Sequence, residues 1–266
     1  MEKQYLAFLG SELLVREGAE GPALDGASLE GLARTARRDF DWEGLTWSAL
    51  ALDPAAGEEA RARGLGTLPV RQALALWPEA ALRPLFKGLA LLNWLEGARH
   101  CGACGTLLVD AAARDPEGEV AAAGGRTCPS CGRPHFPRIS PAVIVLVRKE
   151  GKALLARNAR MPPGGRFGLL AGFVEVGETL EEAAVREVRE EAAIEIGNLR
   201  YRKSQPWPFP DSLMLAYTAD WVSGEARPDG AEIAELRWCG PEELPEIPPP
   251  GSVARALIDA FAAGGD

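Results

Sequence analysis

The most regular pattern of apolar and polar positions lies at residues 180–192, where apolar side chains recur at helical spacing. At ~100° per residue they form one stripe along a helix, made of Leu180, Ala184, Val188 and Ala192. Thr179 and Glu182 stand at the spacing of a capping box, so the helix should begin at about residue 180. Beside the stripe, three carboxylates share a sector of ~100°: Glu187, Glu190 and Glu191.

Around this helix the pattern predicts a mixed sheet with helices packed on it. Residues 142–147 form an unbroken apolar run suited to a central strand. Further strands are expected at 153–156, 167–174, 213–222 and 234–239, with a polar loop at 224–230. A last helix is expected at 253–262, with Ser252 as its N-cap.

The first third of the chain reads as an α+β domain without a catalytic signature. Short strands are predicted at 5–9, 12–15 and 45–52, and helices at 70–77 and 80–95. Four tryptophans there are interpreted as core residues: Trp42, Trp47, Trp77 and Trp94.

Two Cys-x-x-Cys pairs follow, each with a glycine after its second cysteine: Cys101 and Cys104, then Cys128 and Cys131. This spacing places four thiolates for one structural zinc ion, which leaves no open coordination position for catalysis. A redox pair or a disulfide pair is the competing interpretation. Residues 105–127 exceed the usual spacer of roughly 15 to 20 residues, and 110–125 is interpreted as a mobile hairpin tip. Cys239, outside the pairs, is expected to be a buried thiol.

Composition limits the classes of function. The chain has 266 residues, 47% hydrophobic, and a net charge of -9, which argues against broad attraction to nucleic acid or to an anionic membrane, although a local basic site remains open. The chain has no apolar run long enough to span a bilayer, so we expect no membrane partner and a cytoplasmic protein.

The acidic helix edge has two interpretations. Glutamate-rich edges are usually solvated faces, supported here by Arg186 at i,i+4 spacing. However, like charges at this spacing disfavour a helix unless a cation neutralises them, and Mg²⁺ or Mn²⁺ prefers such oxygen ligands.

The stretch from Gly172 to residue 194 resembles the signature of the Nudix hydrolases, which split a nucleoside diphosphate linked to another moiety. All charged positions match: Glu178, Arg186, Glu187, Glu190 and Glu191. Ala193 departs from the pattern, which has glycine there, and left-handed geometry at that place would cost alanine roughly 1 kcal/mol. The resemblance implies an α/β/α sandwich and one to three Mg²⁺ or Mn²⁺ ions.

A second motif, SQPWPFPDS, covers residues 204–212. Its prolines hold the preceding residues extended, so Trp207 and Phe209 are presented at little entropic cost for stacking on a base or a nicotinamide ring. Two other interpretations of the motif are a rigid crossover with buried aromatic side chains and a polyproline ligand for another domain.

This motif resembles that of the NADH pyrophosphatase branch of the Nudix family, with Asp211 in the variable place. The resemblance implies three domains: an N-terminal α+β domain at 1–96, a zinc ribbon at 97–136 and a Nudix catalytic domain at 137–266. It also implies a homodimer, hydrolysis of NAD(H) to nicotinamide mononucleotide and AMP, and in bacteria the removal of NAD caps from RNA.

The resemblance assigns roles to individual residues. Glu187, Glu191 and Glu190 would hold the divalent metal, Glu191 would orient or deprotonate the attacking water, and Arg186 would orient Glu178. The Ala171 carbonyl and the Glu232 carboxylate would complete the metal shell. Substrate contacts are expected from Gln205, Pro206, Trp207, Pro208, Phe209, Pro210, Asp211 and Ser212. The resemblance also assigns substrate contacts to Phe136 and Ala254.

Two other functions stay open from the sequence. A Nudix hydrolase of another substrate, such as ADP-ribose or a nucleoside diphosphate sugar, would keep the glutamates without needing the 204–212 motif. A non-enzymatic nucleotide sensor would be expected to have lost them.

Overall fold

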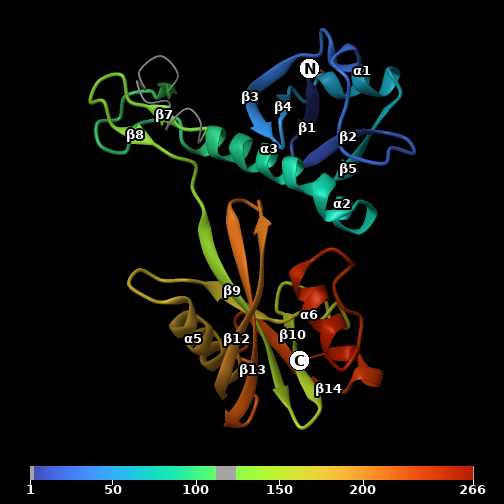
Figure 1. Cartoon of the computed structure of the whole chain (residues 1–266), viewed down its shortest axis with the longest axis vertical. Helices are drawn as coiled ribbons and strands as arrows, with labels where there is room; N and C mark the ends of the chain where they lie inside the picture. The colour runs from blue at the N-terminus through green and yellow to red at the C-terminus, as the bar shows by residue number, and fades with distance from the viewer. Residues whose placement is uncertain (1–2, 112–123, 266) are drawn as a thin grey trace. The chain divides into compact units, whose positions relative to one another are not determined.

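The structure, a computed structural model, describes residues 3–111 and 124–265. Its contacts divide the chain into two compact units: residues 1–139 with 208–211, and residues 140–207 with 212–266. Each unit is built on its own sheet (Figure 1). Most of the predicted hairpin tip at 110–125 lies outside the described residues.

The first unit has a five-stranded sheet in the order β3-β4-β1-β2-β5. β1 and β4 are parallel and the other neighbours antiparallel. Its elements are β1 (Gln4–Leu9), β2 (Glu12–Arg16), β3 (Arg34–Trp42), β4 (Leu45–Leu52), α1 (Ala56–Ala62), β5 (Leu65–Pro69), α2 (Val70–Leu76) and α3 (Glu79–Gly97). The sequence predicted β1, β2, β4, α2 and α3 but not α1, β3 or β5.

Helix α3 packs closely on this sheet because it has a glycine at the crossing point. A Cβ on Gly88 would lie 2.9 Å from Leu6 Cδ1 and 3.1 Å from Ala49 Cβ. Trp47 and Trp77 are buried as predicted, while Trp42 and Trp94 are half-buried.

A small three-stranded sheet follows within the same unit, in the order β6-β7-β8. Its strands are β6 (Val109–Asp110), β7 (Arg126–Thr127) and β8 (Pro134–His135). They lie next in sequence to the two cysteine pairs.

The second unit has a mixed sheet in the order β12-β13-β9-β10-β14, with β11 paired to β9. β13 and β9 are parallel and the other pairs antiparallel. Its elements are β9 (Ser140–Lys149), β10 (Lys152–Asn158), β11 (Leu170–Phe173), α5 (Leu180–Ala192), β12 (Glu195–Trp207), β13 (Ser212–Ser223), β14 (Ile233–Cys239) and α6 (Val253–Ala262). The mixed sheet is as predicted, but β11 is shorter than the predicted strand at 167–174, and β12 is far longer than the few extended residues expected.

Helices cover both faces of this sheet, with α5 on one side and α6 on the other (Figure 1). The apolar run of β9 supplies both cores, because successive side chains of a strand point to opposite faces. Val143 and Val145 pack with Val188 of α5, whereas Ile144 packs with Leu257 of α6. Each buried aliphatic side chain contributes ~1.5–3 kcal/mol, so both helices are held firmly.

Two smaller expectations can be compared directly. Cys239 is 1% exposed, as expected of a buried thiol. None of the helices within the described ranges is long and apolar enough to cross a membrane.

Candidate active site

Helix α5 begins and ends as its sequence dictates. The Thr179 hydroxyl accepts the Glu182 amide at 3.2 Å, and the Glu182 carboxylate accepts the Thr179 amide at 2.8 Å, so the predicted capping box is confirmed. Ala193 ends the helix in the left-handed conformation, with φ 56°. The helix therefore presents its glutamates from a fixed frame.

The Glu187 carboxylate lies directly over Gly172 of β11. A Cβ added at residue 172 would meet the Glu187 carboxyl carbon and Oε1 at 2.0 Å. Only glycine allows this approach, because any side chain would occupy the place of the carboxylate. The Glu187 side chain is accordingly only 14% exposed.

Arg186 is the centre of an ion-pair network. Its Nε and Nη2 donate to the two oxygens of Glu178 at 2.6 and 2.9 Å, and Nη2 also donates to the Phe173 carbonyl at 2.9 Å. Its Nη1 donates to Glu187 and to Glu190, each at 2.9 Å. These hydrogen bonds hold the pKa of Glu178 at about 2. One guanidinium thus serves three carboxylates.

Glu191 is the most buried carboxylate of the helix, at 6% exposure. Its Oε2 accepts the backbone amide of Ala171 at 3.1 Å. Burial, and to a lesser extent the charges of Glu187, Glu232 and Asp229, raises the pKa of Glu191 to about 8 against that hydrogen bond. Burial also raises the pKa of Glu187, against the pairing with Arg186. The environment of the two carboxylates therefore disfavours their charged forms.

Glu232 joins this acidic group from the loop before β14. Asp229 accepts the backbone amides of Glu232 at 3.1 Å and of Ile233 at 2.8 Å, and the Glu232 carbonyl accepts the Ala159 amide at 2.7 Å. Sequence reasoning selected Glu232 but missed Asp229. The Asp-Gly pair at 229–230 is a turn signal that would have indicated an aspartate capping its own loop.

Glu190 is not brought into the buried group. Its side chain is 59% exposed and is paired with Arg186 on the outer side of the helix. Among the described residues, the glutamates do not bring three oxygens within 4.8 Å of one another, and only the four cysteines form such a cluster. The donor set of Glu187, Glu191 and the exposed Glu232 consists of carboxylates only, and it nevertheless fits the oxygen preference of Mg²⁺ or Mn²⁺.

The 204–212 motif is divided between the two units, because residues 208–211 cluster with the first. In the second unit, the buried Gln205 donates to the Gly251 carbonyl and accepts the Val253 amide, each at 2.8 Å. These contacts fix the start of α6 and with it the neighbouring Ala254. Pro206 and Trp207 end β12, opposite Leu213 and Ser212.

Within the first unit, α3 holds the other half of the motif. Asn93 donates to the carbonyls of Pro208 at 3.2 Å and Pro210 at 3.0 Å. The Phe209 ring meets Phe86 edge-on at 6.5 Å, and the Arg71 guanidinium lies 4.8 Å from its centre. For Phe209, these contacts agree with the alternative interpretation of the motif as a rigid crossover whose aromatic side chains pack against the protein. Two further residues predicted to contact substrate also lie in this unit: Asp211 pairs with Arg138 at 3.5 Å, and Phe136 is 51% exposed.

One exposed ring beside the glutamates was missed from the sequence. Phe173 ends β11 next to Gly172 and is 56% exposed, while its carbonyl is held by Arg186. An exposed phenylalanine on a rigid strand offers a face on which a flat ring can stack.

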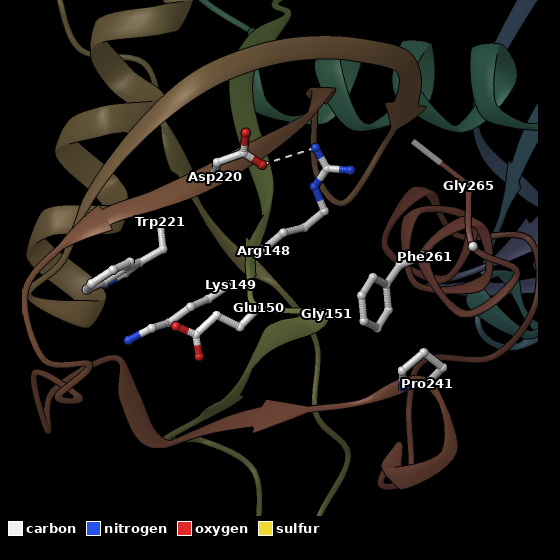
Figure 2. Close-up of a pocket in the computed structure, with 10 residues that line it drawn as sticks. Arg148, Lys149, Glu150, Gly151, Asp220, Trp221, Pro241, Phe261 and Gly265 are labelled. Carbon is white, nitrogen blue, oxygen red and sulfur yellow. Dashed lines mark hydrogen bonds and ion pairs between the residues drawn. The ribbon is translucent and has the colours of Figure 1, made fainter.

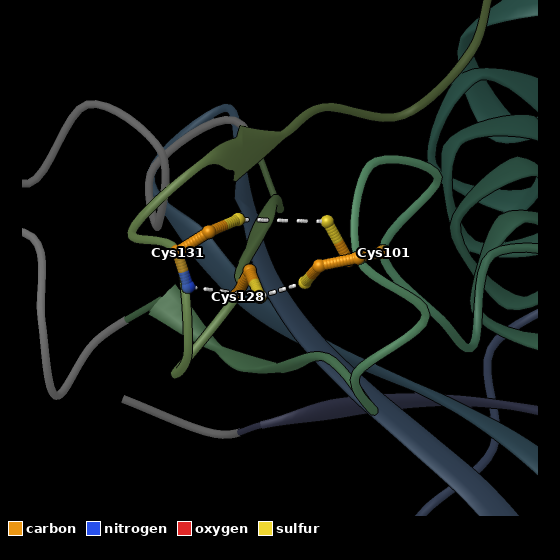
Figure 3. A group of neighbouring side chains, drawn as sticks. Cys101, Cys128 and Cys131 are labelled. Carbon is orange, nitrogen blue, oxygen red and sulfur yellow. Dashed lines mark hydrogen bonds between the residues drawn. The ribbon is translucent and has the colours of Figure 1, made fainter.

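The four cysteines predicted to bind zinc converge (Figure 3). Cys101 Sγ lies 3.7 Å from Cys131 Sγ, and Cys104 Sγ lies 3.5 Å from Cys128 Sγ. Four sulfurs at the corners of a tetrahedron with Zn–S bonds of ~2.3 Å would be about 3.8 Å apart. The cysteines are free thiols and not disulfides, so the cluster has the chemistry and spacing for one zinc ion.

The chain is similar to several known proteins. Residues 137–261 match the family model of the NUDIX domain. The NAD-capped RNA hydrolase NudC of Chromobacterium violaceum is 44% identical over 191 residues, which cover 72% of this chain and 68% of that protein. The protein of the same name from Pseudomonas aeruginosa is 40% identical over 222 residues, covering 84% and 75%. A NUDIX hydrolase structure from Nitrosomonas europaea is 27% identical, with a TM-score of 0.49 over 63% of this chain and 94% of that one.

Proposed function

The chain belongs to the Nudix family, in the branch of the NAD-capped RNA hydrolases, and we propose that it hydrolyses the pyrophosphate bond of NAD(H) to nicotinamide mononucleotide and AMP. The same reaction on a 5′ NAD cap would release nicotinamide mononucleotide and leave RNA with a 5′ monophosphate. The observation that carries the proposal is the pair of the partly buried Glu187 and the buried Glu191 beside β11, on a helix with the complete set of Nudix charges.

The residues that would hold the divalent cation are Glu187, Glu191 and Glu232, with the Ala171 carbonyl, and Glu190 once it leaves Arg186. One to three Mg²⁺ or Mn²⁺ ions bound there would offset charge on the phosphoryl oxygens and acidify a bound water. Glu191 is assigned the proton of the attacking water, because it is the most buried carboxylate of the group and the Ala171 amide fixes its position.

Arg186 has a positioning role in this proposal. Its guanidinium is occupied by Glu178, the Phe173 carbonyl and Glu187. It therefore ties the loop at 173–178 to the helix and orients Glu187.

We assign the dinucleotide to the surface formed by the exposed Phe173 and the end of β12 at Trp207. If Trp207 stacks on the substrate, replacing it by alanine should raise KM for NADH more than KM for a small diphosphate. Equal effects on both substrates would indicate that the ring is structural. Steady-state kinetics with the two substrates measures the difference.

Zinc is proposed to have a structural role only. Four cysteine ligands would fill its tetrahedral coordination and leave no position for substrate. A homodimer is also proposed, on the resemblance alone, and light scattering of the purified protein tests it.

The experiment that tests the function is incubation with NADH and Mn²⁺ or Mg²⁺, with and without EDTA. Chromatography and mass spectrometry should find AMP and reduced nicotinamide mononucleotide only when the metal is present. Glu191→Gln should lose about a thousandfold in rate with an unchanged melting temperature. Glu181→Gln, the same change on an exposed position of α5, is the matched control and should be fully active.

The outcomes separate the alternatives. Cleavage of ADP-ribose with no cleavage of NADH would assign the chain to another Nudix specificity. Binding without turnover, in folded protein with metal, would favour a nucleotide sensor.

A further inference from the structure

Glu232 differs from the other carboxylates of the proposed metal site, because its side chain is exposed and nothing pairs with it. Glu187 is paired with Arg186, and Glu191 accepts the Ala171 amide. In the part of the chain that the structure describes, the Glu232 carboxylate has no hydrogen bond or ion pair, and the hydrogen bonds of this residue are those of its backbone. The position of this carboxylate is therefore decided by the loop that carries it.

The loop before β14 starts from a fixed point on the sheet. Trp221 Nε1 donates to the Gly224 carbonyl at 3.1 Å, and the Lys149 ammonium lies 3.6 Å from the centre of the Trp221 ring. Trp221 and Lys149 both line the cavity drawn in Figure 2. Gly224 has a φ of 94°, and a Cβ there would lie 2.8 Å from the Ala193 carbonyl oxygen. The loop therefore leaves β13 directly against the end of α5.

Two further backbone hydrogen bonds hold the loop in place. The Arg227 amide donates at 3.0 Å to the carbonyl of Ala192, the residue that follows Glu191. The Ala159 amide donates to the Glu232 carbonyl at 2.7 Å. The loop that carries Glu232 is thus tied both to the end of α5 and to the residue that follows β10.

Asp229 holds the last turn of the loop, in which Glu232 lies. One of its carboxylate oxygens accepts the Ile233 amide at 2.8 Å, and the other accepts the Glu232 amide at 3.1 Å. The Gly230 amide donates to the Ile233 carbonyl at 3.1 Å and closes the turn. Ile233 is 3% exposed and packs in the same core as Val188 of α5. The backbone of Glu232 is consequently held between a carboxylate cap and a buried side chain.

Asp229 could serve a bound cation in two ways, because it lies near Glu191 as well as Glu232. Burial is the main cause that raises the pKa of Glu191, and the negative charges of Glu232 and Asp229 are among those that add to it. The charge of Asp229 could attract the cation, or its oxygens could place Glu232. The hydrogen bonds favour the second role, since both oxygens of Asp229 are engaged by backbone amides.

We propose that Asp229 is a positioning residue of the metal site, which holds the backbone of Glu232 so that the Glu232 carboxylate can bind the divalent cation together with Glu187 and Glu191. This inference rests on the proposed function, which includes Glu232 among the metal ligands. Asp229 itself does not touch the cation. Residues that hold a metal ligand in place typically contribute roughly 10- to 100-fold to metal affinity or activity.

Titration of the full chain with Mn²⁺, followed by electron paramagnetic resonance of the free ion, measures metal binding without hydrolysis. Asp229→Asn removes the charge but keeps an oxygen that can accept the amides, so its affinity for Mn²⁺ should stay within about threefold of that of the unmodified protein. Asp229→Glu keeps the charge, but its extra methylene displaces the oxygens from the amides, so its affinity should fall about tenfold or more. The matched control is Glu225→Gln, which removes one charge from a side chain of the same loop that is 77% exposed, and it should bind Mn²⁺ like the unmodified protein.

A second pair of variants tests whether Asp229 acts through Glu232. Glu232→Gln should itself weaken Mn²⁺ binding, because it replaces a carboxylate ligand with an amide. Adding Asp229→Glu to Glu232→Gln should then cause little further loss, since both changes affect the same ligand. A merely structural role of Asp229 would lower the melting temperature of Asp229→Glu and leave its affinity for Mn²⁺ unchanged.

Three results would overturn the inference. Asp229→Asn could lose as much affinity as Asp229→Glu, which would assign the effect to charge. The loss in Asp229→Glu could be absent, or could persist in full beside Glu232→Gln. Glu232→Gln could bind Mn²⁺ as tightly as the unmodified protein, which would remove Glu232 from the metal ligands. Failure of the proposed function is distinguishable from all three, because Mn²⁺ would then bind with the expected dependence on Asp229 while NADH stays intact.

Discussion

Replacing Gly172 by alanine should disable the proposed active site while leaving the protein folded. The new Cβ would lie 2.0 Å from the Glu187 carboxyl carbon and Oε1, and 2.2 Å from Oε2. Cβ atoms essentially never have contacts under 3.0 Å, so the carboxylate must move. The end of a glutamate is flexible, and its displacement costs mainly the partly buried ion pair with Arg186, ~1 kcal/mol.

The effect on rate should be much larger than the effect on stability. The carboxylate has to move by roughly 1 Å, and a misplacement of that size in a catalytic group costs ~100-fold in rate, or about 2.7 kcal/mol of transition-state stabilisation. We therefore expect kcat/KM for NADH to fall ~100-fold, with a decrease in melting temperature of only a few degrees. The assay is steady-state hydrolysis of NADH with Mn²⁺, alongside thermal unfolding.

Gly168→Ala is the matched control. A Cβ at Gly168 meets nothing within 4 Å, so this variant should match the unmodified protein in rate. If Gly172→Ala hydrolyses NADH within threefold of the unmodified protein, the position of Glu187 over Gly172 is not needed for the reaction. If instead Gly172→Ala unfolds, the flexible carboxylate cannot move aside and the backbone must shift to relieve the contact.

Three further predictions concern stability. Ala193 stands in the left-handed region at φ 56°, so Ala193→Gly should raise the free energy of unfolding by ~0.5–1 kcal/mol, and an unchanged urea midpoint would show that no strain is present. Without divalent cation, the pKa of Glu191 is about 8 in the folded protein against 4.5 as the ordinary value. The folded state binds the extra proton between these values, so stability is highest below about pH 4.5 for this group and falls as pH rises through 8. Melting temperatures measured over this window should therefore fall more steeply with pH than those of Glu191→Gln, and parallel curves would contradict the raised pKa. Cys104→Ser should reduce bound zinc, measured by mass spectrometry of the metal, and should speed proteolysis in residues 97–136, whereas Cys239→Ser should leave the zinc content unchanged because Cys239 lies outside the cluster.

Features encoded by neighbouring residues could be predicted from the sequence. The start of α5 is set by Thr179 and Glu182, whose side chains and amides satisfy each other within three residues. The left-handed conformation of Ala193 is also a local feature, because helices commonly end with one residue in this conformation. The zinc knuckles are equally local, because each Cys-x-x-Cys pair and the glycine that follows form one tight turn.

Features that depend on distant partners could not be predicted in this way. β12 contains proline, glycine and charged residues, so its pattern is weak, and it is a strand because β13 pairs with it along its length. The separation of residues 208–211 from the rest of their motif depends on Asn93, which lies more than a hundred residues earlier and donates to two of their carbonyls.

The acidic group at the site is held by the protein itself. Glu191 is fixed by the Ala171 amide, Glu187 by the gap at Gly172, and the Glu232 loop by Asp229. Burial, and after it the repulsion among these carboxylates, raises the pKa of Glu191, and burial raises the pKa of Glu187 against its pairing with Arg186, so the cost of holding these charges remains in the folded protein. A divalent cation that binds only the folded state would offset this cost, so the same free energy appears as metal affinity and as added stability. Because the fold holds several carboxylates close together, the site lowers the free energy of unfolding without metal and is at the same time arranged to bind a divalent cation.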